Sequence, residues 1–168
     1  MATFDTNDVN TTIILEILRR EGGLTNNPRD AGGRTDKGIS ERAHPDVWRD
    51  NQVTLEEATD IYRRKYLEGP RIAEIVDPRL RAQMADIAVN SGPGVAIQKL
   101  QGLVGAKVDG VLGPKTLALV NTHPEPIRLN NLLALERVKM IGRIVQKNPS
   151  QSVFLVGWIN RALEHIIG

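Results

Sequence analysis

The sequence predicts a mainly α-helical protein with one irregular excursion near its start. Apolar residues recur at helical spacing along most of the 168 residues. By contrast, residues 22–47 are rich in Gly, Asn, Asp and Pro and show little periodicity. We therefore expect a helical fold with a small irregular loop or β-hairpin excursion near residues 25–45.

The first predicted helix covers residues 8–21. Its buried face is a single stripe of apolar residues, namely Val9, Ile13, Ile14, Ile17 and Leu18. Gly22 and Gly23 follow as a stop signal, so Glu21 lies in the last turn. The negative end of the helix dipole disfavours an ionised carboxylate there, and Lys or Arg is the usual occupant. Glu21 is thus expected at a position that costs some stability.

Six further helices are predicted, and their limits are set by capping residues, Gly and Pro. The first is opened by the capping box Thr54-Leu55-Glu56-Glu57 and ends before Gly69-Pro70. Of the others, one begins at Pro78 and closes at Gly92, one covers about 94–104, and one begins at Pro114. The last two cover roughly 126–147 and 151–166. A turn through Asp109-Gly110 and a break at Asn148-Pro149 separate neighbours among them.

Composition excludes several kinds of chemistry. The chain has no Cys, which removes disulfides, thiolate catalysis and Cys-based zinc sites. Its three His residues are scattered without metal-binding spacing, so we expect no metal and no cofactor. The 22 Lys+Arg and 20 Asp+Glu nearly cancel to a formal net charge of +2, so we expect no nucleic acid partner.

The sequence also predicts where the chain is made. No stretch approaches the roughly 18 to 20 apolar residues of a membrane span, so we expect no stable membrane insertion. The first ten residues, MATFDTNDVN, lack the basic region and the apolar run of a signal peptide. We therefore expect synthesis in the cytoplasm without a signal peptide, and a separate export route if the substrate lies outside the inner membrane.

Two carboxylates near the irregular segment are candidates for catalysis. Glycoside hydrolysis needs a protonated carboxylic acid for the leaving oxygen and usually a second carboxylate. Glu21 and Asp30 are suitably spaced, because a helix end that turns into a loop can bring Asp30 back across a cleft. Thr35 follows as a candidate to hold a water or orient a sugar, and Gly33 would let a bulky glycan approach the backbone. On spacing alone, ordinary roles as a solvated charge and a turn former remain open for the pair.

The stretch EGGLTNNPRDAGGRTDKGIS, residues 21–40, resembles the opening signature of glycoside hydrolase family 108. In that signature Glu-Gly-Gly is followed by Asn-x-x-Asp, Gly-Gly-x-Thr and Gly-Ile-Thr or Gly-Ile-Ser. The resemblance continues in DIAVNSGPGVAIQKLQ, in VDGVLGPKTLALV and in FLVGWINRALE near the C-terminus. It therefore covers roughly the whole chain.

The resemblance implies a lysozyme-like helical fold and an N-acetylmuramidase of the phage endolysin type. Such an enzyme hydrolyses peptidoglycan between N-acetylmuramic acid and N-acetylglucosamine, and Glu21 would be its general acid. Asp30 and Thr35 would complete the catalytic group, as in the similar layout of older phage lysozymes, where the Thr stands one residue further on. Asp36 is a competing carboxylate. Whether the reaction retains or inverts the anomeric configuration stays open, since it depends on the carboxyl separation.

The later segment QKLQGLVGAKVDGVLGPKTLALVN, residues 98–121, resembles the peptidoglycan-binding region that accompanies this catalytic family. We therefore expect a catalytic region over 1–92 and a peptidoglycan-binding-like region over 93–168. No Ser- or Gly-rich tether separates them, which favours one compact unit. In the second region we expect a set of apolar residues in the core: Leu100, Leu103, Val108, Val111, Leu112 and Leu117.

Further residues are candidates for sugar contacts. Trp48 and Tyr62 would offer aromatic faces for sugar rings, although core filling is the alternative for Tyr62. Asn90 matches the Val-Asn-x-Gly of the resembled family and would bond an N-acetyl group or cap its own helix. Trp158 is expected to be a packing anchor.

The functional interpretation is a phage or prophage lysis enzyme. It would be made in the host cytoplasm, pass a holin pore or another export route, and act as a monomer on peptidoglycan at the cell wall or in the periplasm. Two alternatives stay open. A lytic transglycosylase would use one Glu and release an anhydro product, and a noncatalytic peptidoglycan-binding module would have the cleft without the acid.

Overall fold

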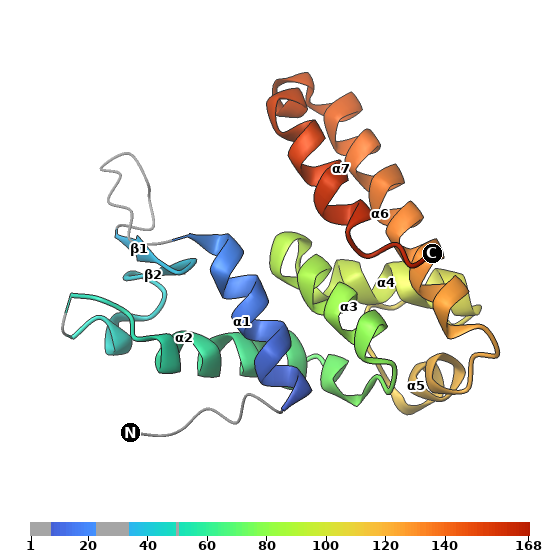
Figure 1. The fold of residues 1–168 in the computed structure, drawn as a ribbon, viewed down its shortest axis with the longest axis horizontal. Helices are drawn as coiled ribbons and strands as arrows, with labels where there is room; N and C mark the ends of the chain where they lie inside the picture. The colour runs from blue at the N-terminus through green and yellow to red at the C-terminus, as the bar shows by residue number, and fades with distance from the viewer. Residues whose placement is uncertain (1–7, 23–33, 50) are drawn as a thin grey trace. The chain divides into compact units, whose positions relative to one another are not determined.

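The computed structural model describes residues 8–22, 34–49 and 51–168, and within these ranges the protein is mainly α-helical with one small hairpin (Figure 1). This confirms the predicted fold class. The chain divides into two compact units, Met1–Gly69 and Pro70–Gly168. None of the described helices combines the length and the hydropathy that a membrane-spanning segment needs.

Helix α1 of the first unit, Val9–Glu21, has the limits that the sequence predicts. It begins at Asp8, whose carboxylate accepts hydrogen bonds from the backbone N–H groups of Asn10 and Thr11, both at 3.2 Å. The Arg63 side chain also donates to this carboxylate, at 2.9 Å. The apolar stripe of the helix is buried, apart from its exposed first member, Val9.

A two-stranded antiparallel hairpin follows, formed by β1 (Thr35–Asp36) and β2 (Ile39–Ser40). Thr35 lies opposite Ser40, and Asp36 lies opposite Ile39. The predicted β-hairpin excursion is therefore present in the described part of the segment. A short 3-10 turn, η1 (Pro45–Val47), leads on toward the next helix.

Helix α2, Leu55–Tyr62, begins at the predicted capping box. The backbone N–H of Thr54 donates to the Glu57 carboxylate at 2.9 Å, and the Glu57 N–H donates to the Thr54 hydroxyl at 3.2 Å. The helix then continues without a break into a π-helix, η2 (Arg63–Glu68). The sequence pattern predicts one regular helix here, and it does not reveal this change of winding.

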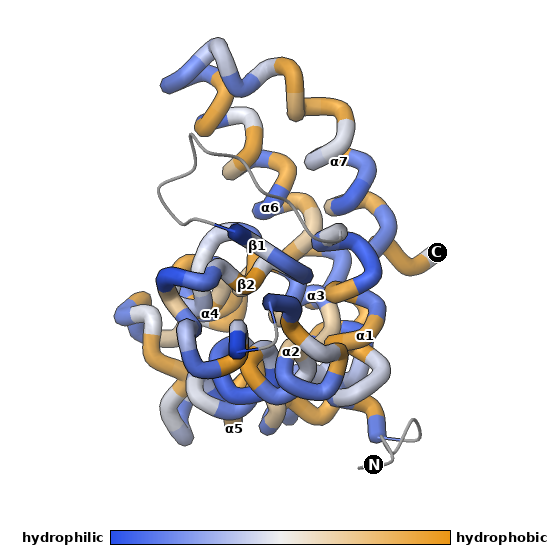
Figure 2. The backbone as a smooth tube through the Cα atoms, turned by 90° about the vertical axis from the view of Figure 1, so that its left-hand side faces the viewer, coloured by the Kyte–Doolittle hydropathy of each residue, from blue (hydrophilic) through white to orange (hydrophobic). Residues whose placement is uncertain are grey.

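The second unit contains the remaining helices: η3 (Ile72–Glu74), α3 (Pro78–Ser91), α4 (Pro93–Val104), α5 (Pro114–Asn121), α6 (Pro126–Lys147), η4 (Pro149–Phe154) and α7 (Leu155–Leu163). Helix α3 packs against α4, α6 packs against α7, and α6 also contacts both α3 and α4. Along α6 and α7 the backbone alternates between hydrophobic and hydrophilic segments, as amphipathic helices do (Figure 2). The core of the second unit is formed by large side chains that include Leu80, Met84, Ile87, Ile97, Leu100, Leu129 and Leu133.

A buried cluster of charges joins three helices of this unit. Asp86 of α3 is 1% exposed, and its carboxylate contacts Arg137 of α6 at 2.5 Å and Arg161 of α7 at 2.7 Å. His165 lies 3.6 Å from the same carboxylate. Burial alone would raise the pKa of Asp86, but hydrogen bonds from His165 and Arg161 and the charges of both arginines outweigh it and hold this pKa well below its usual range. The cluster thus fixes α7 and the C-terminal turn to the centre of the unit.

Candidate functional site

Glu21 is the last residue of α1 and is half-buried. The next residue, Gly22, leaves the helix with a φ of +83°. The side chain lies against the turn of the hairpin, because a Cβ atom placed on Gly38 would stand 3.7 Å from the Glu21 Cβ. The helix end and the hairpin turn therefore meet at the base of the Glu21 side chain.

The hairpin turn is held by Tyr62 of α2. Its ring is buried, with 4% of the residue exposed, and its hydroxyl donates to the Lys37 carbonyl at 3.1 Å. Gly38 has a φ of +74°, and a Cβ on it would overlap the Tyr62 hydroxyl oxygen. Glycine is thus required by both the backbone conformation and the lack of space.

Another carboxylate near the hairpin turn belongs to Asp36, which ends β1 and is buried, at 4% exposure. It accepts hydrogen bonds from the Lys37 ammonium group at 2.9 Å and from the Val53 N–H at 3.2 Å. The Lys37 ammonium group also donates to the Val53 carbonyl at 2.8 Å. Asp36 therefore ties the hairpin to the segment before α2, and its neighbour Thr35 lies half-buried on β1.

The aromatic residue Trp48 is buried, at 3% exposure. The Arg34 guanidinium group lies over its ring, 5.1 Å from the centroid, and is oriented by two hydrogen bonds to Glu41 at 2.9 and 2.7 Å. The indole Nε1 has no hydrogen-bond partner among the described residues. The rings of Trp48 and Tyr62 are therefore both enclosed by the unit, and neither presents an open face.

The remaining predicted site residues lie elsewhere or are not described. Asp30 and Gly33 fall outside the described residues. Asn90 is an exposed residue near the end of α3 in the second unit, and its side-chain N–H donates to the Asp86 carbonyl at 2.6 Å. It lines a cleft of about 180 Å³ together with Trp158, which stacks on Phe154 with ring centroids 5.5 Å apart.

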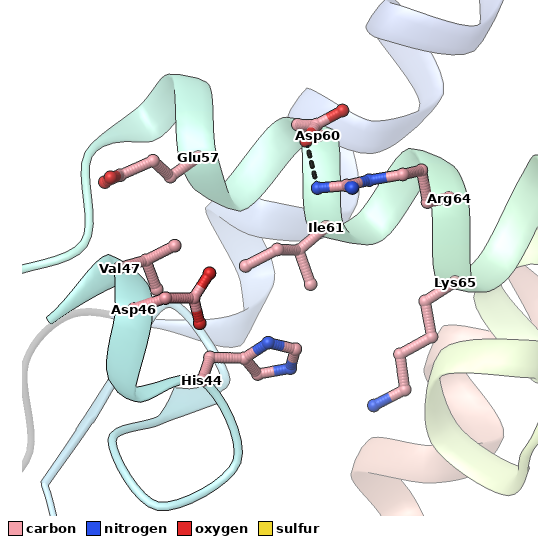
Figure 3. A pocket seen from close by; sticks show the side chains of 8 residues that line it. All are labelled: His44, Asp46, Val47, Glu57, Asp60, Ile61, Arg64 and Lys65. Carbon is pink, nitrogen blue, oxygen red and sulfur yellow. Dashed lines mark hydrogen bonds and ion pairs between the residues drawn. The ribbon is translucent and has the colours of Figure 1, made fainter.

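The first unit also has an open groove of about 490 Å³, which contains none of the residues predicted from the sequence (Figure 3). It is lined by residues around η1 and along α2 and η2: His44, Asp46, Val47, Glu57, Asp60, Ile61, Arg64 and Lys65. Figure 3 shows Ile61 pointing from α2 into the space that His44 and Asp46 approach from the other side. In the sequence, the polar residues that α2 contributes to this groove look like an ordinary solvated helix face, so only the fold reveals the groove.

A substitution at Gly38 tests the packing of this site. Gly38→Ala is expected to lower the free energy of unfolding by about 1–3 kcal/mol, because alanine resists a positive φ and its methyl group would displace the Tyr62 hydroxyl. Chemical denaturation measures the effect. In a Tyr62→Phe background the same substitution is expected to cost less, since the overlapping oxygen is gone. An equal cost in both backgrounds would contradict the close approach.

Comparisons with known proteins match the chain to two family models and to a solved structure. The family model described as Glycosyl hydrolase 108 matches residues 14–92, and the model described as Predicted Peptidoglycan domain matches residues 95–163. The chain is also similar to a solved structure whose title is "Structure of Brucella abortus SagA". The two are 29% identical with a TM-score of 0.73, over 95% of this chain and 92% of that chain. Among curated proteins, no match is found.

Proposed function

Since the chain belongs to glycoside hydrolase family 108, has a lysozyme-like fold and carries a peptidoglycan-binding region, we propose that it hydrolyses peptidoglycan between N-acetylmuramic acid and N-acetylglucosamine. Glu21 is the general acid in this proposal. The observation that carries it is the meeting of the Glu21 side chain with the hairpin turn at Gly38. The hairpin turn thus stands beside the Glu21 side chain at the end of α1.

The surroundings of Glu21 support its role as a proton donor. A general acid must hold its proton until the leaving oxygen needs it. Glu21 is half-buried at the C-terminal end of α1, and its side chain lies against the hairpin turn. Asp36 lies close by in the sequence, but its buried carboxylate accepts hydrogen bonds from Lys37 and Val53 and so has a structural role in the hairpin.

We assign the second carboxylate to Asp30, on the spacing of the motif alone, and a water- or sugar-orienting role to Thr35. Thr35 stands on β1 two residues before the Lys37-Gly38 turn that contacts Tyr62. Gly33 would allow the glycan to approach the backbone. For Asn90, the hydrogen bond from its amide to the Asp86 carbonyl favours the alternative role at the end of its own helix. Because the rings of Trp48 and Tyr62 are buried, a structural role for both is favoured, and stacking on sugar rings is not.

Analysis of the digestion products tests the bond that is cleaved. Purified peptidoglycan is digested, reduced with borohydride and examined by mass spectrometry. The proposal predicts fragments that end in reduced muramic acid. Reduced glucosamine ends would mean cleavage of the other glycosidic bond, anhydromuramic ends would mean a lytic transglycosylase, and absence of fragments would mean a binding module.

We further propose that the enzyme is a monomeric endolysin of the phage type, which reaches the wall through a holin or another export route. The support is the likeness of its motif to phage enzymes. Expression in a Gram-negative host with and without a holin tests this role. Lysis only when the holin is present is the expected result, whereas lysis without any added pore would contradict the dependence on it.

A further inference from the structure

The loop between α4 and α5 has an unusually complete internal framework. Gln101 of α4 is 1% exposed, and its side-chain amide donates to the Asp109 carboxylate at 2.8 Å and to the Val111 carbonyl at 3.0 Å. Its amide oxygen accepts from the N–H groups of Asp109 and Gly110, at 3.0 and 2.9 Å. One buried side chain thus fixes three consecutive residues of the loop, because all its strong hydrogen bonds are made there.

Other contacts hold the same loop. The Asp109 carboxylate also accepts from the Val111 N–H at 3.0 Å, and hydrogen bonding from Gln101 lowers the pKa of Asp109, so the group stays ionised. Gly110 has a φ of +77°, and a Cβ on it would stand 3.4 Å from the Gly94 carbonyl. Leu112 is 1% exposed and anchors the loop in the core. The loop is therefore preorganised and does not depend on a ligand for its shape.

The outer side of this rigid loop is apolar and exposed, contrary to the sequence prediction. Val108 and Val111 were expected in the core, but they are 57% and 64% exposed, and Leu119 of α5 is 45% exposed. The prediction was wrong for the two valines because Gln101 takes the buried side of the loop. Val111 and Leu119 also line one groove, so these two exposed apolar side chains border the same space.

Two lysines border this surface. An open groove of about 650 Å³ runs between the loop and the start of α5, and Lys107, Lys115, Val111 and Leu119 are among its lining residues. The Lys107 side chain is 88% exposed, and its ammonium group is 3.9 Å from the Asp109 carboxylate, which is a loose contact. Lys115 is exposed at the first turn of α5. Asp109 also lines the groove, so an anionic group there would share Lys107 with this carboxylate and meet Lys115 directly.

We propose that this groove binds the stem peptide of peptidoglycan, with Lys107 and Lys115 on its carboxylates and Val111 and Leu119 against its alanine methyl groups. The inference rests on the proposed function, since it takes peptidoglycan as the partner. The stem peptide carries both kinds of group, several free carboxylates and small aliphatic side chains. A glycan strand would favour an aromatic face, and the described residues that line the groove include none.

Binding of a free stem tetrapeptide, L-Ala-γ-D-Glu-meso-diaminopimelate-D-Ala, to the full chain tests the proposal by calorimetry. This probe has no glycosidic bond, so the result does not depend on catalysis. The double variant Lys107→Gln/Lys115→Gln is expected to bind about tenfold or more weakly, because two charge-assisted contacts are lost. The matched control Arg143→Gln/Lys147→Gln removes two exposed cations of α6 and is expected to bind as the parent does.

A second measurement separates peptide from glycan recognition. The full chain is incubated in the cold with intact sacculi and with glycan strands from which an amidase has removed the stems. Retention on intact sacculi that falls when the stems or both lysines are removed is the expected result. Equal binding of the tetrapeptide by parent and double variant, or equal retention on stripped glycan, would overturn the proposal. Loss of catalysis in any variant would bear on the proposed function and not on this groove.

Discussion

Glu21→Gln is expected to lower the rate of peptidoglycan hydrolysis by about a hundredfold or more. General acid catalysis contributes factors of this size, and glutamine has no proton to give to the leaving oxygen. The substitution keeps the shape of the side chain, so its packing against Gly38 is preserved. The measurement is the initial rate of turbidity loss of a purified peptidoglycan suspension.

A matched variant on the same helix controls for general effects. Glu16→Gln removes an exposed carboxylate of α1 and is expected to leave the rate nearly unchanged. Circular dichroism is expected to give the same helical spectrum for both variants and the parent. Near-normal hydrolysis by Glu21→Gln, or an equal loss in Glu16→Gln, would remove the assignment of the acid.

Asp86→Asn is expected to lower the free energy of unfolding by about 3–5 kcal/mol, the largest stability effect predicted for a single side chain. Removing one partner from a buried ion pair leaves the other charges uncompensated. Here Arg137 and Arg161 would both lose their carboxylate, with side chains only 5% and 19% exposed. Denaturant unfolding of the second unit measures the loss. Glu125→Gln, which removes an exposed ion pair with Arg128, is the control and is expected to change little.

The effect of Asp86→Asn is also expected to depend on pH. In the folded protein the pKa of Asp86 lies below its ordinary value of 3.8, so the ionised group stabilises the fold at higher pH. This stabilisation is complete above about pH 5 and is lost as the pH falls toward the lowered pKa of the folded state, because the carboxyl of the unfolded chain takes up a proton first, at about pH 4. The difference in stability between parent and variant should therefore be constant from neutral pH to about pH 5 and narrow below pH 4. A constant difference down to pH 2 would contradict this account.

Local signals in the sequence predict most helix limits correctly. The capping box at Thr54 and the prolines at positions 78, 114 and 126 stand where helices begin in the structure. These signals act through backbone groups within one turn, so they need no knowledge of the rest of the fold. The final helix is the exception, because it is divided into the 3-10 turn η4 and the shorter α7.

Features that depend on distant contacts were not predictable from the pattern. Asp86 lies within an apolar helix face, and the two arginines that neutralise it come 51 and 75 residues later. The exposed valines of the α4–α5 loop likewise depend on Gln101, whose bonds have no periodic signature. Periodicity indicates which face of an element is apolar, but it does not indicate which side chain of a loop is buried.

The candidate site likewise has features that the sequence predicts and features that it does not. The motif alone predicts Glu21 as the acid, because the order of residues in the motif is specific. The enclosure of Trp48 and Tyr62 could not be read from it, since aromatic residues fill cores and sugar clefts alike. The compact units divide at Gly69–Pro70, so α3 packs with α4 within the second unit, whereas the glycosyl hydrolase match extends to residue 92.

Digestion in water enriched in oxygen-18 tests the central claim most directly, because hydrolysis adds one solvent oxygen to each new sugar end. With the parent enzyme, muramic acid ends are expected to gain the label, and with Glu21→Gln no labelled ends should form above background. Unlabelled anhydro ends from the parent, or labelled ends from the variant at the parental rate, would contradict hydrolysis driven by the Glu21 proton.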